Sequence, residues 1–273
     1  MNKNNNLELK LENGIYFGQL KKGLPHGYGT ISYNNGDHYE GTFSKGKKDG
    51  QGLFTWTYGK TYEGQFKNDF MDGNGTLFWA NGDKYIGQFK QGNRHGQGTF
   101  VSLKGDRYEG NWQDDMRSGL GKFYYHNGDV FEGEYKNNYR CGYGTYKYQN
   151  GQMYEGMYDK NLENGQGKYT WLIGESYEGE FLNHERTGRG TYHYRNGDIY
   201  EGEWLSGKRH GNGKITYDAG GHFFGIWEND ERRWGTYRNE KDEVFIGEFI
   251  NDLPSSNGKY FDNEGNEINN PNL

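Results

Sequence analysis

Polar and large apolar side chains alternate along this chain in short runs. In Tyr200–Trp204, rings and a glycine alternate with carboxylates, and Gly213–Tyr217 alternates in the same way. A period of two over about five residues is typical of a strand with one exposed face. Turn sequences such as Asn196-Gly197 separate the runs, and their glycine supplies the positive φ that tight hairpins need. The pattern predicts β-hairpins and no helix.

The hairpins recur every 23 residues, except that a one-residue deletion shortens the last interval, from Phe223 to Phe245, to 22. We number the first aromatic residue of each repeat as position 1. Position 3 and position 14 are glycine in all eleven repeats, position 5 is aromatic in ten, and position 16 is always large and apolar or aromatic. Such self-similarity marks a repeat architecture. The expected fold is all-β: an elongated, single-layer antiparallel meander of repeated β-hairpins, on the order of 100 Å long at two strands a repeat. Position 1 is occupied by Tyr16, Tyr39, Tyr62, Tyr85, Tyr108, Phe131, Tyr154, Tyr177, Tyr200, Phe223 and Phe245.

The register within a hairpin follows from matching large residues to glycines. We expect position 1 to face position 18, position 3 to face 16, and position 5 to face 14, so that rings lie over glycines that have no Cβ. The other face would pair Glu201 and Glu203 with Lys214 and Thr216. This register requires an odd-length loop or a bulge at Asn-Gly. In one repeat the predicted pairs are Tyr200 with Tyr217, Gly202 with Ile215, and Trp204 with Gly213.

The two ends differ from the middle of the array. Leu7–Leu11 alternates cleanly, so residues 1–15 are expected to close the N-terminal edge as a capping strand. Residues 16–265 form the repeat array, which we interpret as one domain. Residues 266–273 are polar, and we expect them to fray as a C-terminal tail.

Composition narrows the class of protein. Only 31% of residues are hydrophobic but 18% are aromatic, so rings must supply the packing. A net charge of -6 argues against nucleic acid as a partner, since phosphate binding needs a basic face. The single Cys141 allows no intramolecular disulfide and fits a reducing compartment. Residues 1–6 lack the apolar segment of a secretory signal, and no apolar run is long enough to span a membrane, so we expect a cytoplasmic protein.

The repeat resembles a known family. Tyr-Glu-Gly-Glu-Trp followed by Gly-Lys-x-His-Gly-x-Gly, read at Tyr200–Gly213, with Asn-Gly-Asp at Asn196–Asp198, is similar to the MORN repeat over about residues 16–265. The resemblance implies a twisted single-layer sheet with an aromatic-lined groove. It also implies a scaffold, as in ciliary radial-spoke heads, protist cytoskeletal rings, membrane-junction proteins and recognition modules attached to enzymes. Ser102 departs from the pattern at position 18, and the motif histidine is kept only at His26, His95 and His210.

No residue pattern predicts catalysis, a cofactor or a metal. The Gly-x-Gly runs lack the following helix that a phosphate-binding loop needs. His26, His95 and His210 lie in repeats one, four and nine, so the nearest two should be roughly 30 Å apart at about 10 Å a repeat, too far for a shared zinc. Arg140 beside Cys141 would lower its pKa, but a lone thiol without a base is more often inert. We therefore expect a protein that is not an enzyme.

The aromatic stripe is the candidate binding site. A one-layer sheet is expected to leave the outer surfaces of its rings uncovered, and large exposed apolar patches mark interaction sites. The leading hypothesis is a protein–protein interaction scaffold in a cytoskeletal or ciliary (axonemal, radial-spoke-like) assembly, which binds an extended segment or a helix across several hairpins. The protein could also form oligomers through the ends of the array. The alternatives are a peripheral membrane or phospholipid adaptor, disfavoured by the negative charge, and an aromatic groove for a small ligand, as in choline- or glucan-binding repeats. The expected partner-binding residues are Tyr108, Trp112, Phe131, Tyr135, Tyr154, Tyr158, Trp171, Tyr177 and Phe181.

Overall fold

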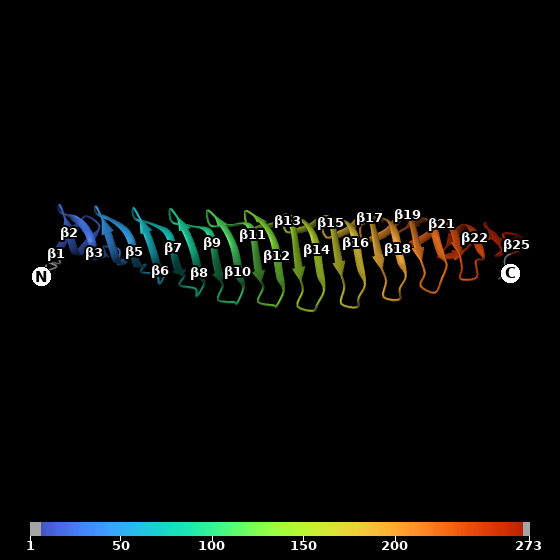
Figure 1. Ribbon diagram of the computed structural model, residues 1–273, viewed down its shortest axis with the longest axis horizontal. Coiled ribbons are helices and arrows are strands. Elements are labelled where there is room, and N and C mark those ends of the chain that lie inside the picture. Colours follow the sequence, from blue (N-terminus) through green and yellow to red (C-terminus); the bar gives the residue numbers. More distant parts are fainter. Residues whose placement is uncertain (1–6, 270–273) are drawn as a thin grey trace. The chain divides into compact units, whose positions relative to one another are not determined.

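The computed structural model describes residues 7–269, and all regular structure in this range is β-strand. The chain divides into two compact units, Met1–Tyr139 and Arg140–Leu273. In each unit the strands follow one another side by side in chain order (Figure 1). Residues 1–6, on which the expectation of no secretory signal rests, and residues 270–273 of the predicted tail lie outside the described range.

The first unit is an antiparallel meander in which each strand pairs with the next. Leu9 of the first strand pairs with Tyr16 of the second, so Leu7–Leu11 borders the first repeat. The strands are β1 (Leu7–Leu11), β2 (Gly14–Lys21), β3 (Leu24–Tyr33), β4 (His38–Ser44), β5 (Lys47–Thr55), β6 (Thr61–Lys67), β7 (Phe70–Phe78), β8 (Lys84–Lys90), β9 (Asn93–Val101), β10 (Arg107–Gln113), β11 (Met116–Tyr124) and β12 (Val130–Lys136).

The second unit continues the same hairpin pattern. At its C-terminal end β22 pairs with both β23 and β24, and β25 pairs with β24 inside the segment expected as a tail. The predicted all-β meander of hairpins is thus confirmed in each unit. The strands are β13 (Tyr139–Lys147), β14 (Met153–Asp159), β15 (Leu162–Thr170), β16 (Ser176–Leu182), β17 (Glu185–His193), β18 (Ile199–Leu205), β19 (Lys208–Thr216), β20 (His222–Glu228), β21 (Glu231–Arg238), β22 (Val244–Ile250), β23 (Leu253–Pro254), β24 (Lys259–Phe261) and β25 (Glu267–Ile268).

The predicted register is wrong by two residues. Tyr200 pairs with Ile215, and Gly202 pairs with Gly213, so position 1 faces 16 and position 3 faces 14. The reason lies in the return turn. Ser206 and Gly207 have φ of 47° and 77° and form a two-residue hairpin turn, two residues earlier than the predicted register required. A bulge between Gly202 and Trp204 then adjusts the pairing.

The other turn has the expected odd length. The Tyr194 N–H donates to the carbonyl of Asp198 (2.9 Å), and the Gly197 N–H donates back to Tyr194 (3.1 Å). Three residues therefore form the loop, with Gly197 at a φ of 93°. Because both turns recur in every complete repeat, the alternation of faces is preserved along each unit.

Glycines at positions 3 and 14 allow the rings to lie flat on the sheet. Gly213 faces Gly202, and a Cβ on Gly213 would stand 2.6 Å from Cε2 of Tyr200. The principle that rings cover glycines is therefore right, but the covering ring is position 1 of the same repeat. Trp204, expected opposite Gly213, pairs instead with Arg209 in its own hairpin, and on its other side it pairs with Gly188 of the preceding repeat.

Candidate interaction site

Eight of the nine expected binding residues are buried rings, four of them in a column of the first unit and four in a column of the second. Tyr108 is fully buried and Trp112 is only 5% exposed. Trp112 packs edge-on against Tyr108 at 5.2 Å, and Tyr135 of the next repeat packs on Tyr108 at 5.3 Å. The same edge-to-face contacts join Tyr154, Phe181 and Tyr177 in the second unit. Such contacts between rings are stabilising, so this column is the core.

The expectation that these rings are uncovered is therefore wrong. The physical reason is that neighbouring repeats cover them: each position-5 ring stands between two position-1 rings, at 5.1 Å from both in the case of Phe43. A partner could not touch the column without opening the fold. Of the nine residues, only Trp171 is half-buried and accessible. That these nine residues bind a partner stays a prediction.

The hydroxyls of the column are structural. Tyr200 donates to the carbonyl of Glu203 at 3.0 Å, at the bulged residue of its own strand. Burial raises the pKa of the Tyr108 hydroxyl to about 12, so it remains a donor at neutral pH. Eight tyrosines make this bond: Tyr16, Tyr39, Tyr62, Tyr85, Tyr108, Tyr154, Tyr177 and Tyr200.

A second row, at positions 10 and 18, is accessible, and we call it the cation–ring row. Its position-18 rings are half-buried. Its position-10 cations lie over rings: the guanidinium carbon of Arg94 stands 5.8 Å from the centroid of Trp79, and that of Arg186 stands 5.9 Å from Trp171. In the first unit the row contains Lys48, Arg94 and Arg117 with Tyr33, Trp56, Trp79 and Tyr125. In the second unit it contains Arg140, Arg186, Arg209 and Arg232 with Tyr148, Trp171, Tyr194 and Tyr217.

The arginines of this row also join successive repeats. Arg209 lies 4.2 Å from the ring centroid of Trp227, and its Nε and Nη2 donate to a carboxylate oxygen (3.2 Å) and the carbonyl (2.8 Å) of Asp230. Arg94 makes the same pair with Asp115. Sequence reasoning missed these residues. The signal was present, because Lys or Arg recurs at this position with the 23-residue period of the array.

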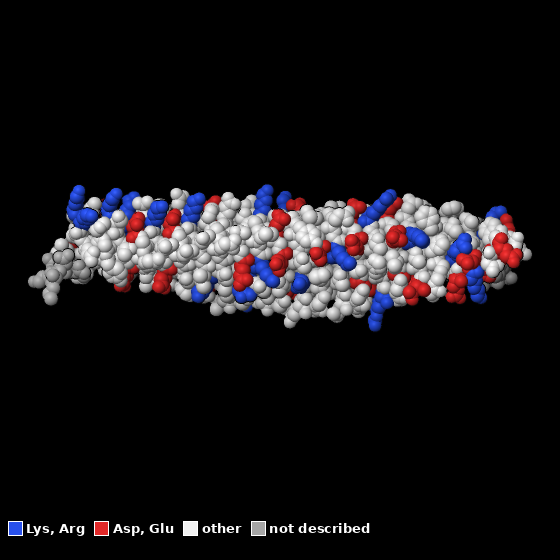
Figure 2. All heavy atoms as spheres, viewed as in Figure 1, with Lys and Arg blue, Asp and Glu red and all other residues white. Residues whose placement is uncertain are grey.

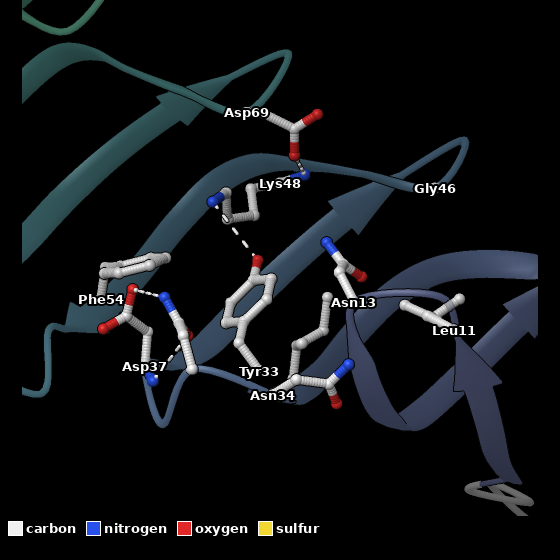
Figure 3. Close-up of a pocket in the computed structure, with 11 residues that line it drawn as sticks. Leu11, Asn13, Tyr33, Asn34, Asp37, Gly46, Lys48, Phe54 and Asp69 are labelled. Atoms are coloured by element: carbon white, nitrogen blue, oxygen red, sulfur yellow. Dashed lines mark hydrogen bonds between the residues drawn. The ribbon is translucent and has the colours of Figure 1, made fainter.

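Lys48 lines a hollow of the first unit, a cavity of about 690 Å³ (Figure 3). Its Nζ is 4.6 Å from the ring centroid of Phe54 and donates to the Tyr33 hydroxyl at 3.5 Å. Burial lowers the pKa of Lys48, while the carboxylates of Asp69 and Asp37 act in the opposite direction. A lysine has no guanidinium fork to fill this space, so the hollow stays open beside the ammonium and the rings of Tyr33 and Phe54.

Glu163 interrupts the row in the second unit. It occupies position 10, is only 6% exposed, and has a carboxylate oxygen 3.6 Å from Nδ1 of His184. Burial raises the pKa of the Glu163 carboxyl, and the charges of His184 and Arg140 oppose this rise. The position that carries a cation in the flanking repeats is thus an acid here.

The opposite face of the sheet, which we call the outer face, carries mostly polar side chains. Lys122 pairs with Glu132 at 3.0 Å, and Lys168 pairs with Glu178 at 3.6 Å. Two shallow cavities of about 620 and 330 Å³ in the second unit share Gln166 and Glu178 and have glycines in their floor. On the side drawn in Figure 2, positive and negative side chains are interspersed, and no large area carries one sign of charge.

No group of three or more His, Cys, Asp or Glu side chains among residues 7–269 is placed to hold a metal ion. His95 and His210 each keep a buried Nδ1 without a hydrogen-bond partner in the described structure. Cys141 is half-buried in β13. Within the same described range, no helix is long and apolar enough to cross a membrane.

Ten segments of the chain match the family model described as MORN repeat. The segment 223–244 lies between two matches without one, although it forms a hairpin whose Phe223 and Trp227 are buried like their counterparts. The matched residues are 16–38, 39–60, 62–84, 85–107, 108–130, 131–153, 154–175, 177–199, 200–222 and 245–267.

Similar solved structures include the TCP10 domain of Danio rerio CPAP in complex with a peptide of STIL. It is 11% identical with a TM-score of 0.44 over 81% of this chain and 93% of that chain. Another is the TCP domain of Drosophila melanogaster SAS-4 with a proline-rich motif of Ana2, which is 11% identical with a TM-score of 0.37 over 65% of this chain and 90% of that chain. At such scores the partners of those proteins do not transfer to this one. No curated protein matches the chain.

Proposed function

The chain belongs to the MORN-repeat family, and on this basis we propose that it is a non-catalytic scaffold that binds other proteins along the cation–ring row. The observation that supports this proposal is the division of its rings into two sets. The rings of the buried column hold the repeats together, whereas position-18 rings such as Trp79 and Trp171 remain half-exposed beside cations. Trp, Tyr and Arg are the residue types most often found at interface hot spots.

The spacing of the row defines the shape of the partner. Each repeat adds two strands, so equivalent rings stand about 10 Å apart. A compact loop would reach one or two of them, while an extended segment or a helix laid across the strands would reach several. One point of entry in the first unit is the hollow beside Lys48 and Tyr33.

By analogy with the family, we propose that the protein acts in a cytoskeletal or ciliary assembly. The alternative is an adaptor for anionic lipid. The arginines of the row favour it, but Arg94 and Arg209 already pair with Asp115 and Asp230. The net charge of -6 also opposes attraction to an anionic membrane.

The experiment identifies the proteins that co-purify with two double variants of the chain and compares them with those that co-purify with the wild type. Trp79→Ser with Trp171→Ser removes accessible rings of the row, and Glu132→Lys with Glu178→Lys reverses charges on the outer face. We expect the row variant to lose the partners of the wild type and the outer-face variant to keep them. Equal loss from both, or retention by the folded row variant, would refute this choice of surface. Salt-sensitive sedimentation with vesicles containing anionic lipid would favour the lipid adaptor instead.

A further inference from the structure

The outer face turns apolar at the repeat formed by residues 223–244. Position 2 is glutamate in seven of the eleven repeats, but Phe224 holds it here and Ile246 holds it in the next repeat. Phe224 and Trp234 are each 56% exposed, and Ile226 is 40% exposed. We call Phe224, Ile226, Trp234 and Ile246 the apolar patch. It lies on the outer face, away from the cation–ring row.

The one-residue deletion in this repeat assembles the patch. In the preceding repeat the bulge between Gly202 and Trp204 leaves Glu203 without a partner in β19, and it pairs only with Arg189 of β17. Here the shortened β21 moves the irregularity to Ile226/Trp227, and Ile226 pairs directly with Trp234. Phe224 pairs with Thr236, which in turn pairs with Ile246. Side chains directly opposite on one face are about 5 Å apart at Cβ, so the four residues form one continuous surface.

The charges around the patch identify the kind of partner. Lys122 and Lys168 have a glutamate at position 2 of the next repeat, whereas the equivalent Lys214 faces Phe224. On its other side Lys214 faces Glu201 of its own repeat, as Lys122 faces Glu109, but its ammonium makes no ion pair within 4.0 Å in the described part of the chain. Lys259 faces Ile246 at the other end of the row and pairs with Glu267 at 3.0 Å. The only acid opposite a patch residue is Glu248, which faces Trp234 and accepts a hydrogen bond from Asn257.

We propose that this patch docks an amphipathic segment of a partner protein whose apolar side chains are flanked by Asp or Glu. The apolar side chains would cover Phe224 and Trp234, and an acid would neutralise Lys214. A second copy of this chain fits less well. The row across the patch has a lysine at each end, so a two-fold packing on the patch would bring lysine against lysine. This surface is independent of the one proposed for the scaffold function.

The test is selection from a displayed library of random dodecapeptides on the full chain, with counter-selection on Phe224→Glu. This substitution installs the glutamate that seven repeats carry, gives Lys214 a carboxylate, and should fold with an unchanged melting temperature. We expect peptides that combine two or more large apolar residues with Asp or Glu. Selected peptides should bind Phe224→Glu at least 10-fold more weakly than wild type. Trp234→Ser should show the same loss.

The matched control is Ile86→Glu, which makes the same change at the only other apolar position 2 between repeats two and nine. It should leave peptide affinity unchanged. Lys214→Glu should invert the preference toward peptides with basic flanks. The proposal is overturned by failure to enrich any peptide, by basic selected peptides, or by equal binding to Phe224→Glu. It is also overturned if the wild type sediments as a dimer that Phe224→Glu converts to monomer, because the occupant is then a second copy.

Discussion

The carboxylate of Glu163 lies 3.6 Å from Nδ1 of His184, where flanking repeats place an arginine against the turn of the next repeat. Arg140 donates to Asn161 in this way, and Arg209 donates to Asp230. The acid therefore lies on the strand and the basic side chain lies in the turn, which is the reverse of Arg209 and Asp230. Its acid is buried, whereas the side chain of Asp230 is 46% exposed.

This burial predicts an unusual pH dependence. Burial raises the pKa of Glu163 above its ordinary value of 4.5, so the folded state holds this proton more tightly than the unfolded state. The resulting stability is fully present below about pH 4 and is lost as the pH rises through the folded pKa. Glu163→Gln removes the titration, so its melting temperature should exceed that of wild type by an amount that grows from pH 4 to pH 8. A difference that is independent of pH would show that Glu163 titrates normally.

Restoring the flanking pattern should stabilise the repeat further. In Glu163→Arg with His184→Asn, the guanidinium would lie over the ring of Phe181 and donate to the turn, as Arg140 does at Tyr158 and Asn161. We expect a gain of about 1–2 kcal/mol in the free energy of unfolding from the ring contact and the hydrogen bonds. Urea titration of both single variants and the double variant would measure it. The double variant should be more stable than the sum of the two single effects predicts. Additive single effects would show that the new arginine and asparagine do not interact.

The strand pattern was predictable because a side-chain period of two and a 23-residue repeat are both visible in the sequence. The register was not, because the segment from Ser206 to Gly211 offers two glycines at which the chain could turn. The deciding signal is in other repeats, where the turn is Asn137-Asn138 or Asp114-Asp115, residue types that tolerate positive φ. Comparing repeats at this position would have placed the turn two residues earlier.

The position of the rings was predictable, but their burial was not. Alternation places Tyr108 and Trp112 on one face of a strand, and a single sheet then seems to leave that face open. The cover comes from the adjacent repeat, through Tyr135 on Tyr108 and Arg94 over Trp112. These contacts depend on the pairing of position 1 with 16, so the error in register also led to the error in burial.

The paired glycines at positions 3 and 14, which we call the glycine ladder, should tolerate no side chain beneath the position-1 rings. Gly213→Ala would place a Cβ 2.6 Å from Cε2 of the fully buried Tyr200, which cannot move without displacing the rings of Trp204 and Trp227. We expect a loss of about 2–3 kcal/mol in the free energy of unfolding. Gly207→Asn is the matched control, because nothing lies within 4 Å of a Cβ there and asparagine tolerates its φ of 77°. Urea titration should show the control within about 0.5 kcal/mol of wild type, and equal losses would contradict the ladder.

The last prediction separates the structural part of the cation–ring row from its proposed part in binding. Arg209→Met keeps an apolar stem over Trp227 but removes the bonds to Asp230. Charge-assisted hydrogen bonds contribute about 1–2 kcal/mol when they are partly exposed, so urea titration should show a loss of that size. Met71 occupies position 10 in the third repeat, so methionine is sterically acceptable there. Asp230→Asn should cost less, because Asn161 accepts from Arg140 in the same geometry.

The reverse change tests the same reasoning. Met71→Arg would meet a turn at Gln91-Gly92, which offers a carbonyl but no carboxylate, so it should gain less than Arg209→Met loses. If Arg209→Met were as stable as wild type, the contacts of the arginines with the next repeat would not stabilise the fold. Binding of a partner would then be the remaining explanation for an arginine at this position in successive repeats. If Arg209→Met loses stability as expected, the arginines have a structural role, and the half-buried rings beside them are the residues whose exposure the fold does not explain. Binding measurements on variants of Trp79 and Trp171 then decide the function of the row.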